Sequence, residues 1–247
     1  GNNVKTIMFN CNEASPCNDV RVRQAICYAI DNESAMQGVL DGAGEAAFCF
    51  GNETSSDVST SWNDGTYYPQ DIDKAKELLK EAGYENGLTL KLLTFTGEQE
   101  TDIANIVYAF LDKIGIKVEI LQYEEALVKT YQRDWSAFDL LILQRNASGT
   151  YILTNWYEKL SKTTWEDGLN YCGFADDTLE KLLDTAYDVK THNEQTVKAV
   201  NDEINENAYV YSMFSGLNYA VHNDTVKEAC LDLDYWLIPG CCTYSWN

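Results

Sequence analysis

The stretch LLILQRNASG, residues 140–149, places three polar side chains directly after an unbroken apolar run. The apolar half is typical of a strand that is buried on both faces of a sheet. Gln144 and Asn146 carry amide donors and acceptors, and the guanidinium group of Arg145 can bind a carboxylate through two parallel hydrogen bonds. These side chains either contact a ligand at the carboxyl end of the strand or form an ordinary polar exit into a loop.

A regular alternation of helix and strand patterns positions this polar segment. Residues 71–84 carry apolar side chains on one helix face, with Asp71 as the expected N-cap and Gly83 after the last turn. An order of β-α-β-α-β with short connections follows, which is typical of a parallel sheet covered by helices. The predicted strands are 88–95, 116–123 and 138–144, and the predicted helices between them are 98–114 and 124–133.

The carboxyl ends of these three strands are the expected ligand site, because open α/β sheets bind ligands at that edge. Phe95–Thr96 follows the first strand, Tyr123–Glu124 the second, and Gln144–Asn146 the third. We expect the three segments to meet near a common edge.

The flanking segments complete the same domain. An aromatic, Gly- and Ser-rich loop is predicted over 41–70, and no domain boundary is evident within residues 1–230, which favours a single α/β domain. Further helices are predicted over about 18–30, 32–40, 179–186 and 197–204, and a strand over 208–223.

Four side chains outside the strand ends have a structural alternative to a binding role. Trp62 and Trp156 either supply flat apolar walls for a ligand or belong to the core, where such rings are common. Arg21 and Arg23 lie two residues apart on a predicted helix and therefore point to different faces. We expect them to pair with nearby acids such as Asp19 or Asp31.

The charge balance excludes two classes of partner. The chain has 39 acidic and 18 basic residues, a net charge of −21 at pH 7. Nucleic acid and anionic membrane surfaces are bound by clusters of Lys and Arg, and the sequence has no such cluster. No apolar run approaches the length of a membrane span. We therefore expect no nucleic-acid partner.

The sequence contains no motif typical of a catalytic, metal-binding or cofactor-binding site. His192 and His222 are the two histidines of the chain, and neither lies near a GxSxG motif. His192 is interpreted as a solvated residue at a helix start. No GxGxxG, phosphate-binding loop or CxxC is present. We expect no enzymatic activity, no cofactor and no metal site.

The eight cysteines leave the redox compartment open. Cys27 lies within an apolar helical run and is interpreted as a small buried hydrophobe. Cys11 and Cys17 are close enough in sequence to form a disulfide, and Cys241 and Cys242 could be bridged to partners elsewhere.

Three ordered stretches together resemble the family 5 extracellular solute-binding proteins of bacteria. The first is FNCNEASPCNDVRVRQAICYAID (9–31), with its Asp-x-Arg-Val-Arg-Gln-Ala core, and the second is YYPQDIDKAKELLKEAGY (67–84). The third is LDKIGIKVEI (111–120) followed by FDLLIL (138–143), and the segment from Tyr211 to Lys227 is loosely similar. Order and spacing agree over about 220 positions, and the first two motifs are the specific ones.

The resemblance implies a two-lobed receptor that encloses an oligopeptide, a dipeptide or another small solute and delivers it to the permease of an ATP-binding-cassette importer. Residues 1–247 would be the C-terminal lobe, an α/β periplasmic-binding-protein type II lobe with a mostly parallel sheet flanked by helices. The N-terminal lobe would precede residue 1, and residues 1–12 and 224–247 would lie near the hinge.

The same resemblance implies an extracellular monomer, either anchored as a lipoprotein in a Gram-positive organism or free in a periplasm. An alternative is a ligand-sensing or surface-interaction lobe that keeps the fold without transport. A rise in melting temperature on adding ligand would separate the two, since it requires binding to the folded state.

The segment after the third strand departs from the pattern of peptide-binding members. Those members place an Asp there, which pairs with the α-amino group of the ligand, whereas this chain has Gln144, Arg145 and Asn146. Either the amine is held elsewhere, or an anionic or neutral ligand binds Arg145. We expect these three residues, with Asn10 and Tyr151, to face the cleft.

Overall fold

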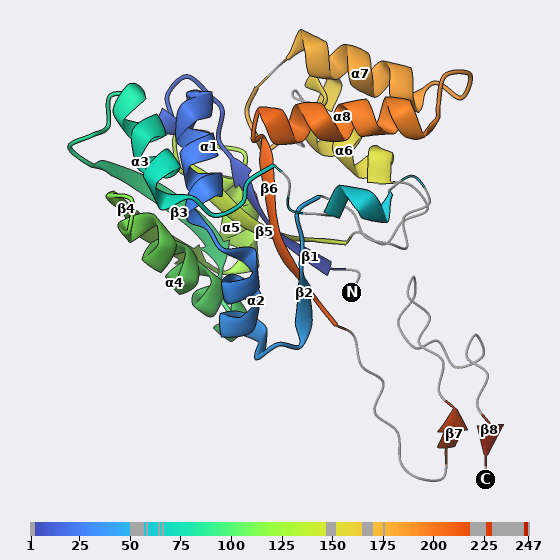
Figure 1. Cartoon of the computed structure of the whole chain (residues 1–247), viewed down its shortest axis with the longest axis horizontal. Helices are drawn as coiled ribbons and strands as arrows, with labels where there is room; N and C mark the ends of the chain where they lie inside the picture. The colour runs from blue at the N-terminus through green and yellow to red at the C-terminus, as the bar shows by residue number, and fades with distance from the viewer. Residues whose placement is uncertain are drawn as a thin grey trace.

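The computed structural model places a six-stranded mixed sheet at the centre of the chain (Figure 1). It describes residues 3–49, 57, 59–63, 65, 67–146, 152–164, 170–174, 176–217, 226–228 and 245–246. The strand order is β2-β6-β1-β5-β3-β4. The strands are β1 (Asn3–Phe9), β2 (Gly44–Ala46), β3 (Leu88–Phe95), β4 (Ile116–Tyr123), β5 (Leu140–Asn146) and β6 (Val210–Gly216), and a separate pair is formed by β7 (Val226–Glu228) and β8 (Ser245–Trp246).

The predicted β-α-β-α-β unit is confirmed. β3 pairs in parallel with both β4 and β5, and the bounds of β3 and β4 coincide with the predicted strands 88–95 and 116–123. The helix before them begins at Asp71, whose side chain accepts a hydrogen bond from the N–H of Lys74, and Gly83 follows it at φ 88°. That left-handed conformation favours glycine, so the predicted helix end is confirmed as well.

The expectation of a mostly parallel sheet needs correction, because the other half of the sheet is antiparallel. β1 runs antiparallel to both β5 and β6, and β2 runs antiparallel to β6. β1 and β6 lie outside the repeating unit and their partners are far away in sequence. The direction of such strands is set by tertiary packing, which hydrophobic periodicity does not encode.

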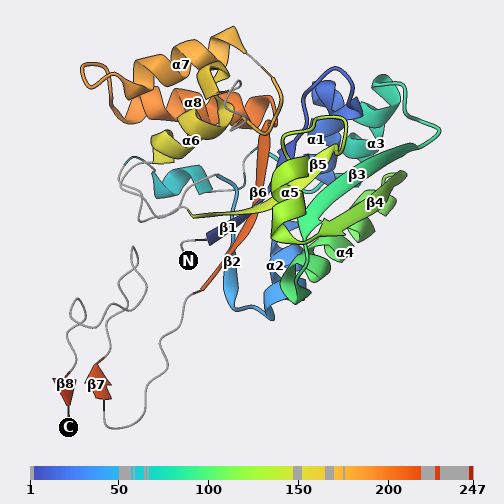
Figure 2. The ribbon, with the colours of Figure 1, turned by 180° about the vertical axis from the view of Figure 1, so that it is seen from behind.

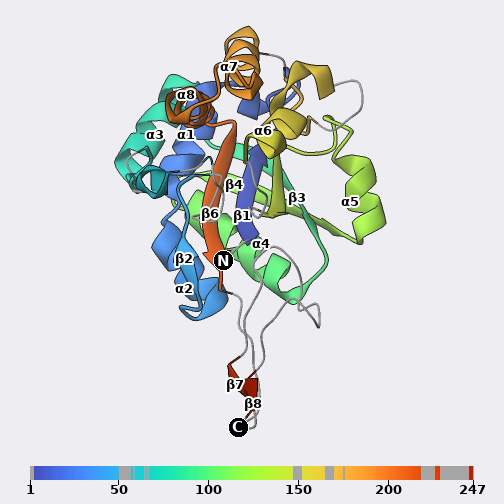
Figure 3. The ribbon, with the colours of Figure 1, turned by 90° about the vertical axis from the view of Figure 1, so that its right-hand side faces the viewer.

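Helices cover both faces of the sheet unequally. α1 to α4 lie on one face, and α5 covers the ends of β3 and β4 on the other (Figures 2 and 3). The third group, α6 to α8, packs together beside the start of β6 (Figure 1). The bounds are α1 (Val20–Ala29), α2 (Asn32–Leu40), α3 (Ile72–Glu81), α4 (Glu98–Asp112), α5 (Glu125–Tyr131), α6 (Ile152–Leu160), α7 (Asp177–Tyr187) and α8 (Glu194–Glu206), with short 3-10 turns at Pro16–Asn18, Thr60–Asn63 and Lys162–Thr164.

One continuous apolar core joins the sheet to its helices. Leu140 to Leu143 are all buried, as the apolar run predicted for a strand covered on both faces. Trp62 and Trp156 are 5% and 2% exposed and belong to this core, so the structural alternative is confirmed for both rings. In the described part of the chain, no helix is long and apolar enough to cross a membrane.

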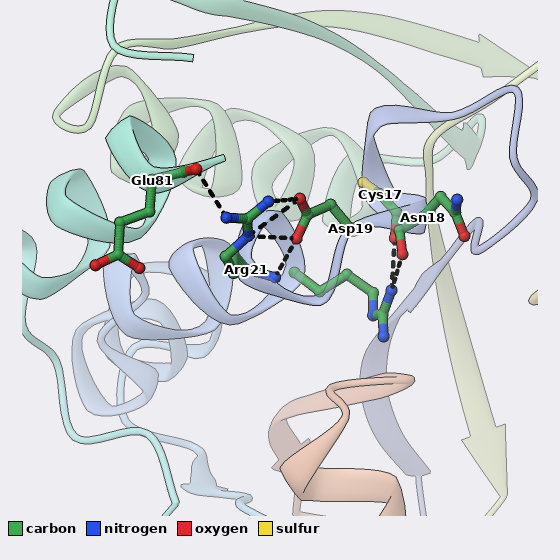
Figure 4. Close-up of polar contacts among 6 residues, drawn as sticks. Cys17, Asn18, Asp19, Arg21 and Glu81 are labelled. Atoms are coloured by element: carbon green, nitrogen blue, oxygen red, sulfur yellow. Dashed lines mark hydrogen bonds and ion pairs between the residues drawn. The ribbon is translucent and has the colours of Figure 1, made fainter. Parts of the chain in front are cut away.

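The two arginines at the start of α1 have different partners, and Figure 4 shows those of Arg21. Arg21 donates two hydrogen bonds from Nε and one from Nη2 to the carboxylate of Asp19 and one from Nη1 to the carbonyl of Glu81, which confirms the predicted pairing with a nearby acid. The buried Arg23 instead donates to the carbonyls of Cys17, Asn18 and Asn207, at 2.7–2.9 Å. For Arg23 the predicted acid pair is therefore wrong, because its neighbours at that depth are backbone carbonyls.

Candidate functional site

A wedge opens between β3 and β5 at their carboxyl ends. The parallel ladder between them consists of the pairs Leu92–Leu140 and Leu93–Leu141, whereas β3 follows β4 along its whole length. Beyond Leu141 the edge of β5 that faces β3 therefore borders a hollow of about 480 Å³. The hollow is lined by Lys5, Phe95, Glu100, Glu125, Lys129, Gln132, Ile142, Leu143, Gln144 and Tyr171.

The hollow lies where the topology of the sheet predicts a ligand site. The strand order changes direction at β5 and β3, and open α/β sheets bind ligands at such a switch point, outside the carboxyl ends of the strands. Phe95 and Gln144 line the hollow, as predicted from their places after the first and third strands. At the end of β4, Glu125 at the start of α5 takes the place expected for Tyr123–Glu124.

A partly buried ion pair lines the hollow. Nζ of Lys5 lies 3.1 Å from Oε1 of Glu100, and the two side chains are 5% and 27% exposed. Lys5 belongs to the central strand β1 and Glu100 to the first turn of α4. A lysine at this depth needs a carboxylate partner, because an unpaired buried charge is strongly destabilising. The pair therefore fixes the Glu100 carboxylate at the rim of the hollow.

A second ion pair lines the α5 side, with a different character. Nζ of Lys129 lies 2.5 Å from Oε1 of Glu125, and the side chains of Glu125 and Lys129 are 70% and 62% exposed. The hydrogen bond from Lys129 lowers the pKa of the Glu125 carboxyl below its ordinary value. Pairs this exposed are weak and readily rearrange. Gln132, which directly follows α5, is buried. Nζ of Lys159 lies over the ring of Tyr171, 5.1 Å from its centre.

The structure describes the predicted ligand residues at the end of the third strand to different extents. Gln144 is exposed, lines the hollow and pairs with Lys5 across the β1–β5 ladder. For Arg145 and Asn146 the structure describes the backbone, which continues the ladder opposite Val4 and Asn3. Tyr151 lies outside the described residues.

Asn10 is placed at the other end of the same ladder. Since β1 and β5 are antiparallel, the residue after Phe9 lies beside Asp139, whereas Gln144 pairs with Lys5 toward the opposite end. The Asn10 side chain is fully buried and donates to the carbonyls of Trp135 and Phe138, at 2.6 and 2.7 Å. The structure therefore does not bring Asn10 together with the polar end of β5.

Sequence reasoning missed four charged residues of the lining, namely Lys5, Glu100, Glu125 and Lys129. One signal was available for Lys5, which is the single charge in the strand NVKTIMF, since a buried charge in a strand demands a partner. Another was the position of Glu100 and Glu125 in helical first turns that directly follow strands. No pattern, however, links Lys5 with a residue 95 positions later.

The cysteine thiols in the described ranges are buried. Cys11 and Cys17 are both unbridged, so the disulfide considered between them is not formed. Cys27 is buried, as predicted, and burial raises the pKa of its thiol. Cys241 and Cys242 lie outside the described residues. Among the residues described, no three His, Cys, Asp or Glu side chains are grouped so as to hold a metal ion.

Comparison with known proteins gives a consistent family assignment. The sequence profile of the bacterial extracellular solute-binding proteins, family 5 (middle region), matches residues 1–167. The oligopeptide-binding protein AppA of Bacillus subtilis is 31% identical over 192 residues, which cover 68% of this chain and 33% of that protein. Heme-binding protein A of Haemophilus influenzae is 36% identical over 132 residues, 51% of this chain and 23% of that protein.

A solved structure of similar fold agrees with this family assignment. A dipeptide-binding protein from Pseudoalteromonas sp. SM9913, in complex with Met-Leu, has a TM-score of 0.78 and 25% sequence identity. The alignment covers 93% of this chain and 46% of that protein. This chain thus spans less than half the length of each of these three relatives.

Proposed function

Because the chain belongs to the bacterial extracellular solute-binding proteins of family 5, we propose that it is the C-terminal lobe of a receptor that delivers peptides or another small solute to an ATP-binding-cassette importer. The observation that carries the proposal is the family match over residues 1–167, because this region includes every residue that lines the hollow except Tyr171. The receptor has no catalytic task, since the family binds and delivers its solutes unchanged.

The course of the chain supports a second lobe that faces the hollow. β1 begins at Asn3, beside the end of β5 at Asn146, and the neighbouring strand β6 ends at Gly216, one residue after Ser215, which pairs with Val4. The chain therefore enters and leaves the sheet at the end where the hollow lies. We propose that residues 1–12 and 224–247 lie near the hinge, and that closure of an upstream lobe covers the hollow and excludes water from the solute.

The proposed ligand contacts are those at this end of the sheet. Gln144 borders the hollow, Arg145 and Asn146 continue the same strand, and Tyr151 follows five residues later. Asn10 is not included, because its amide is fully occupied at the opposite end of the ladder. The lining carries two Lys and two Glu, so its formal charge is zero, and it suits a solute with groups of both signs or none.

The proposed setting follows from the family. The receptor acts outside the cytoplasmic membrane, as a periplasmic protein or a lipid-anchored one, and presents its solute to the importer permease as a monomer. Its charge of −21 disfavours nucleic acid as a partner. Cell fractionation of the native host, with metabolic labelling by a fatty acid, distinguishes a lipid-anchored receptor from a free one.

Thermal unfolding of the full receptor, this chain with its upstream lobe, tests the proposal. The probes are di- and tripeptides, hemin, succinate and glucose, and we expect at least one to raise the melting temperature. Calorimetry with that probe should then show weaker binding for Arg145→Ala, whereas Arg133→Ala, an exposed arginine after α5, leaves binding unchanged. A receptor that binds none of the probes contradicts transport and favours the surface-interaction alternative.

A further inference from the structure

The pair of Lys5 and Glu100 differs from the other ion pairs described in this chain. It joins residues 95 positions apart, and its cation, at 5% exposure, is the most buried of the ammonium and guanidinium groups that form ion pairs in the described residues. Lys5 lies beneath the surface while Glu100 keeps 27% of its side chain exposed at the rim. Both side chains line the hollow, and the carboxylate is the more exposed of the two charged groups.

The Glu100 carboxylate has acceptor capacity that Lys5 does not use. An ionised carboxylate offers about four lone-pair sites on two oxygens. Oε1 accepts from Lys5, and Oε2 lies over Gly97, where a Cβ would overlap it. The carboxylate is thus oriented by Lys5 and packed against Gly97 at the start of its own helix, while 27% of the Glu100 side chain stays exposed at the rim.

The neighbouring side chains suit a cation beside this carboxylate. Phe95 lines the same hollow and offers an aromatic ring, whose face attracts ammonium groups. Gln144 contributes an amide oxygen that can accept a hydrogen bond. The first turn of α4 also carries Glu98, which offsets the positive end of the helix dipole.

An anion on Lys5 is the competing possibility, and burial argues against it. Lys5 is almost inaccessible and is already neutralised by Glu100. An incoming carboxylate would have to displace Glu100 and leave that group without its counter-ion near a buried strand. Such a rearrangement removes as much stabilisation as it adds.

We propose that Glu100, oriented by Lys5, binds the ammonium group of the transported solute, which assigns that solute to the primary amines, with a free peptide N-terminus as the best fit. Lys5 is a positioning residue, because it acts through Glu100. The inference rests on the proposed function and deepens it. Glu100 thereby supplies a carboxylate from α4 in a lobe that has Gln144 and Arg145 where related receptors carry an acid.

The first experiment changes the solute. Isothermal titration of the wild-type full receptor compares each peptide that raised its melting temperature with the N-acetylated form, which has no charge at that end. We expect acetylation to weaken binding by roughly 30-fold or more, as the loss of a charge-assisted contact in a closed site predicts. Because the protein is unchanged, this result does not depend on whether a variant folds.

The second experiment changes the protein. Glu100→Gln keeps the shape and removes the charge, so it should weaken the unmodified peptide by roughly 30-fold and leave the acetylated one within about 3-fold. Glu194→Gln is the matched control, because it removes an exposed carboxylate from the first turn of another helix, α8, outside the lining of the hollow, and it should change either affinity by less than about 3-fold. If Glu100→Gln unfolds, the neutral pair Lys5→Met with Glu100→Gln replaces it.

The outcomes separate this inference from the function on which it rests. Amine-dependent binding that Glu100→Gln weakens supports both. Binding of peptides that is indifferent to Glu100→Gln, or binding of amine-free probes alone, overturns the inference and leaves the receptor function standing. A receptor that binds none of the probes overturns the proposed function and the inference with it.

Discussion

The two ends of the β1–β5 ladder have the same secondary structure but opposite chemistry. At one end, Asn10 is fully buried and its amide is bound to the carbonyls of Trp135 and Phe138. At the other, Lys5 and Gln144 pair across the strands and border a hollow of about 480 Å³. The first can be called the sealed end and the second the open end.

The difference lies in what satisfies the polar groups. At the sealed end, Asn10 also accepts from the N–H of Asn12, and the carboxylate of Asp139 accepts from Ser15 Oγ and from the N–H of Lys91. Main-chain partners cannot leave, so these side chains hold loops in place. At the open end the charged groups pair with other side chains, and the Glu100 carboxylate and the exposed Glu125–Lys129 pair remain accessible to a solute. Asparagine and glutamine in the same sheet thus have structural and binding roles according to their partners.

Removing the Asn10 side chain is expected to have the largest effect on stability. Asn10→Ala leaves one buried carbonyl, one partly buried carbonyl and one partly buried N–H without their partner, so the free energy of unfolding should fall by about 4 kcal/mol. Urea unfolding of the full receptor measures it. Asn18→Ala, whose side chain is exposed, is the control and should change stability by less than about 0.5 kcal/mol. A loss below about 1 kcal/mol for Asn10→Ala would remove the basis for the sealed end.

The two arginines of α1 allow the same comparison, between main-chain and side-chain partners, within one helix. Arg23→Lys loses the planar fork that reaches three carbonyls and should cost about 3 kcal/mol of unfolding free energy. Arg21→Lys keeps an exposed charge beside Asp19 and should leave the unfolding midpoint nearly unchanged. Denaturant titration of both variants is the measurement. Equal effects would show that position on the helix, and not the backbone carbonyls, decides the cost.

Alkaline pH should weaken the sealed end through Cys11. Burial raises the pKa of this thiol to about 11, above the ordinary value of 9.0. A raised pKa means that the stabilisation is complete below pH 9 and is lost as pH rises toward 11, because the unfolded chain ionises first. The lost stability attributable to Cys11 is about 2–3 kcal/mol. Urea unfolding at pH 8 to 11 should therefore show a flatter decline for Cys11→Ala than for the wild type, and equal slopes would contradict the assignment.

At the open end, the effects on stability and on binding should separate. Gln144→Ala removes an exposed side chain, so stability should change by less than about 0.5 kcal/mol, whereas affinity for the bound peptide should fall about 5-fold. Calorimetry and urea unfolding of the same preparation measure both. Gln195→Ala on α8 is the matched control and should change neither quantity. A large loss of stability with normal binding would assign Gln144 to the fold.

Much of the fold could be predicted from sequence because local signals agree there. Gly83 and Gly115 end helices at positive φ, and the alternation of apolar residues fixed the limits of β3 and β4. The site could be predicted in part: the end of β5 follows from the apolar run, and Gln144 lies there. Asn10 was misplaced because the direction of β1 is not encoded locally, and the Lys5–Glu100 pair depends on a contact over 95 positions.

Hydrogen–deuterium exchange of the full receptor, with and without a bound peptide, tests the central claim most directly, because it reports both ends of the ladder in one experiment. The account predicts that the peptide slows exchange in 95–101 and 142–146, at the open end, and leaves 9–12 and 135–139 at the sealed end unchanged. Protection confined to the sealed end, or equal at both, would contradict a solute site between β3 and β5.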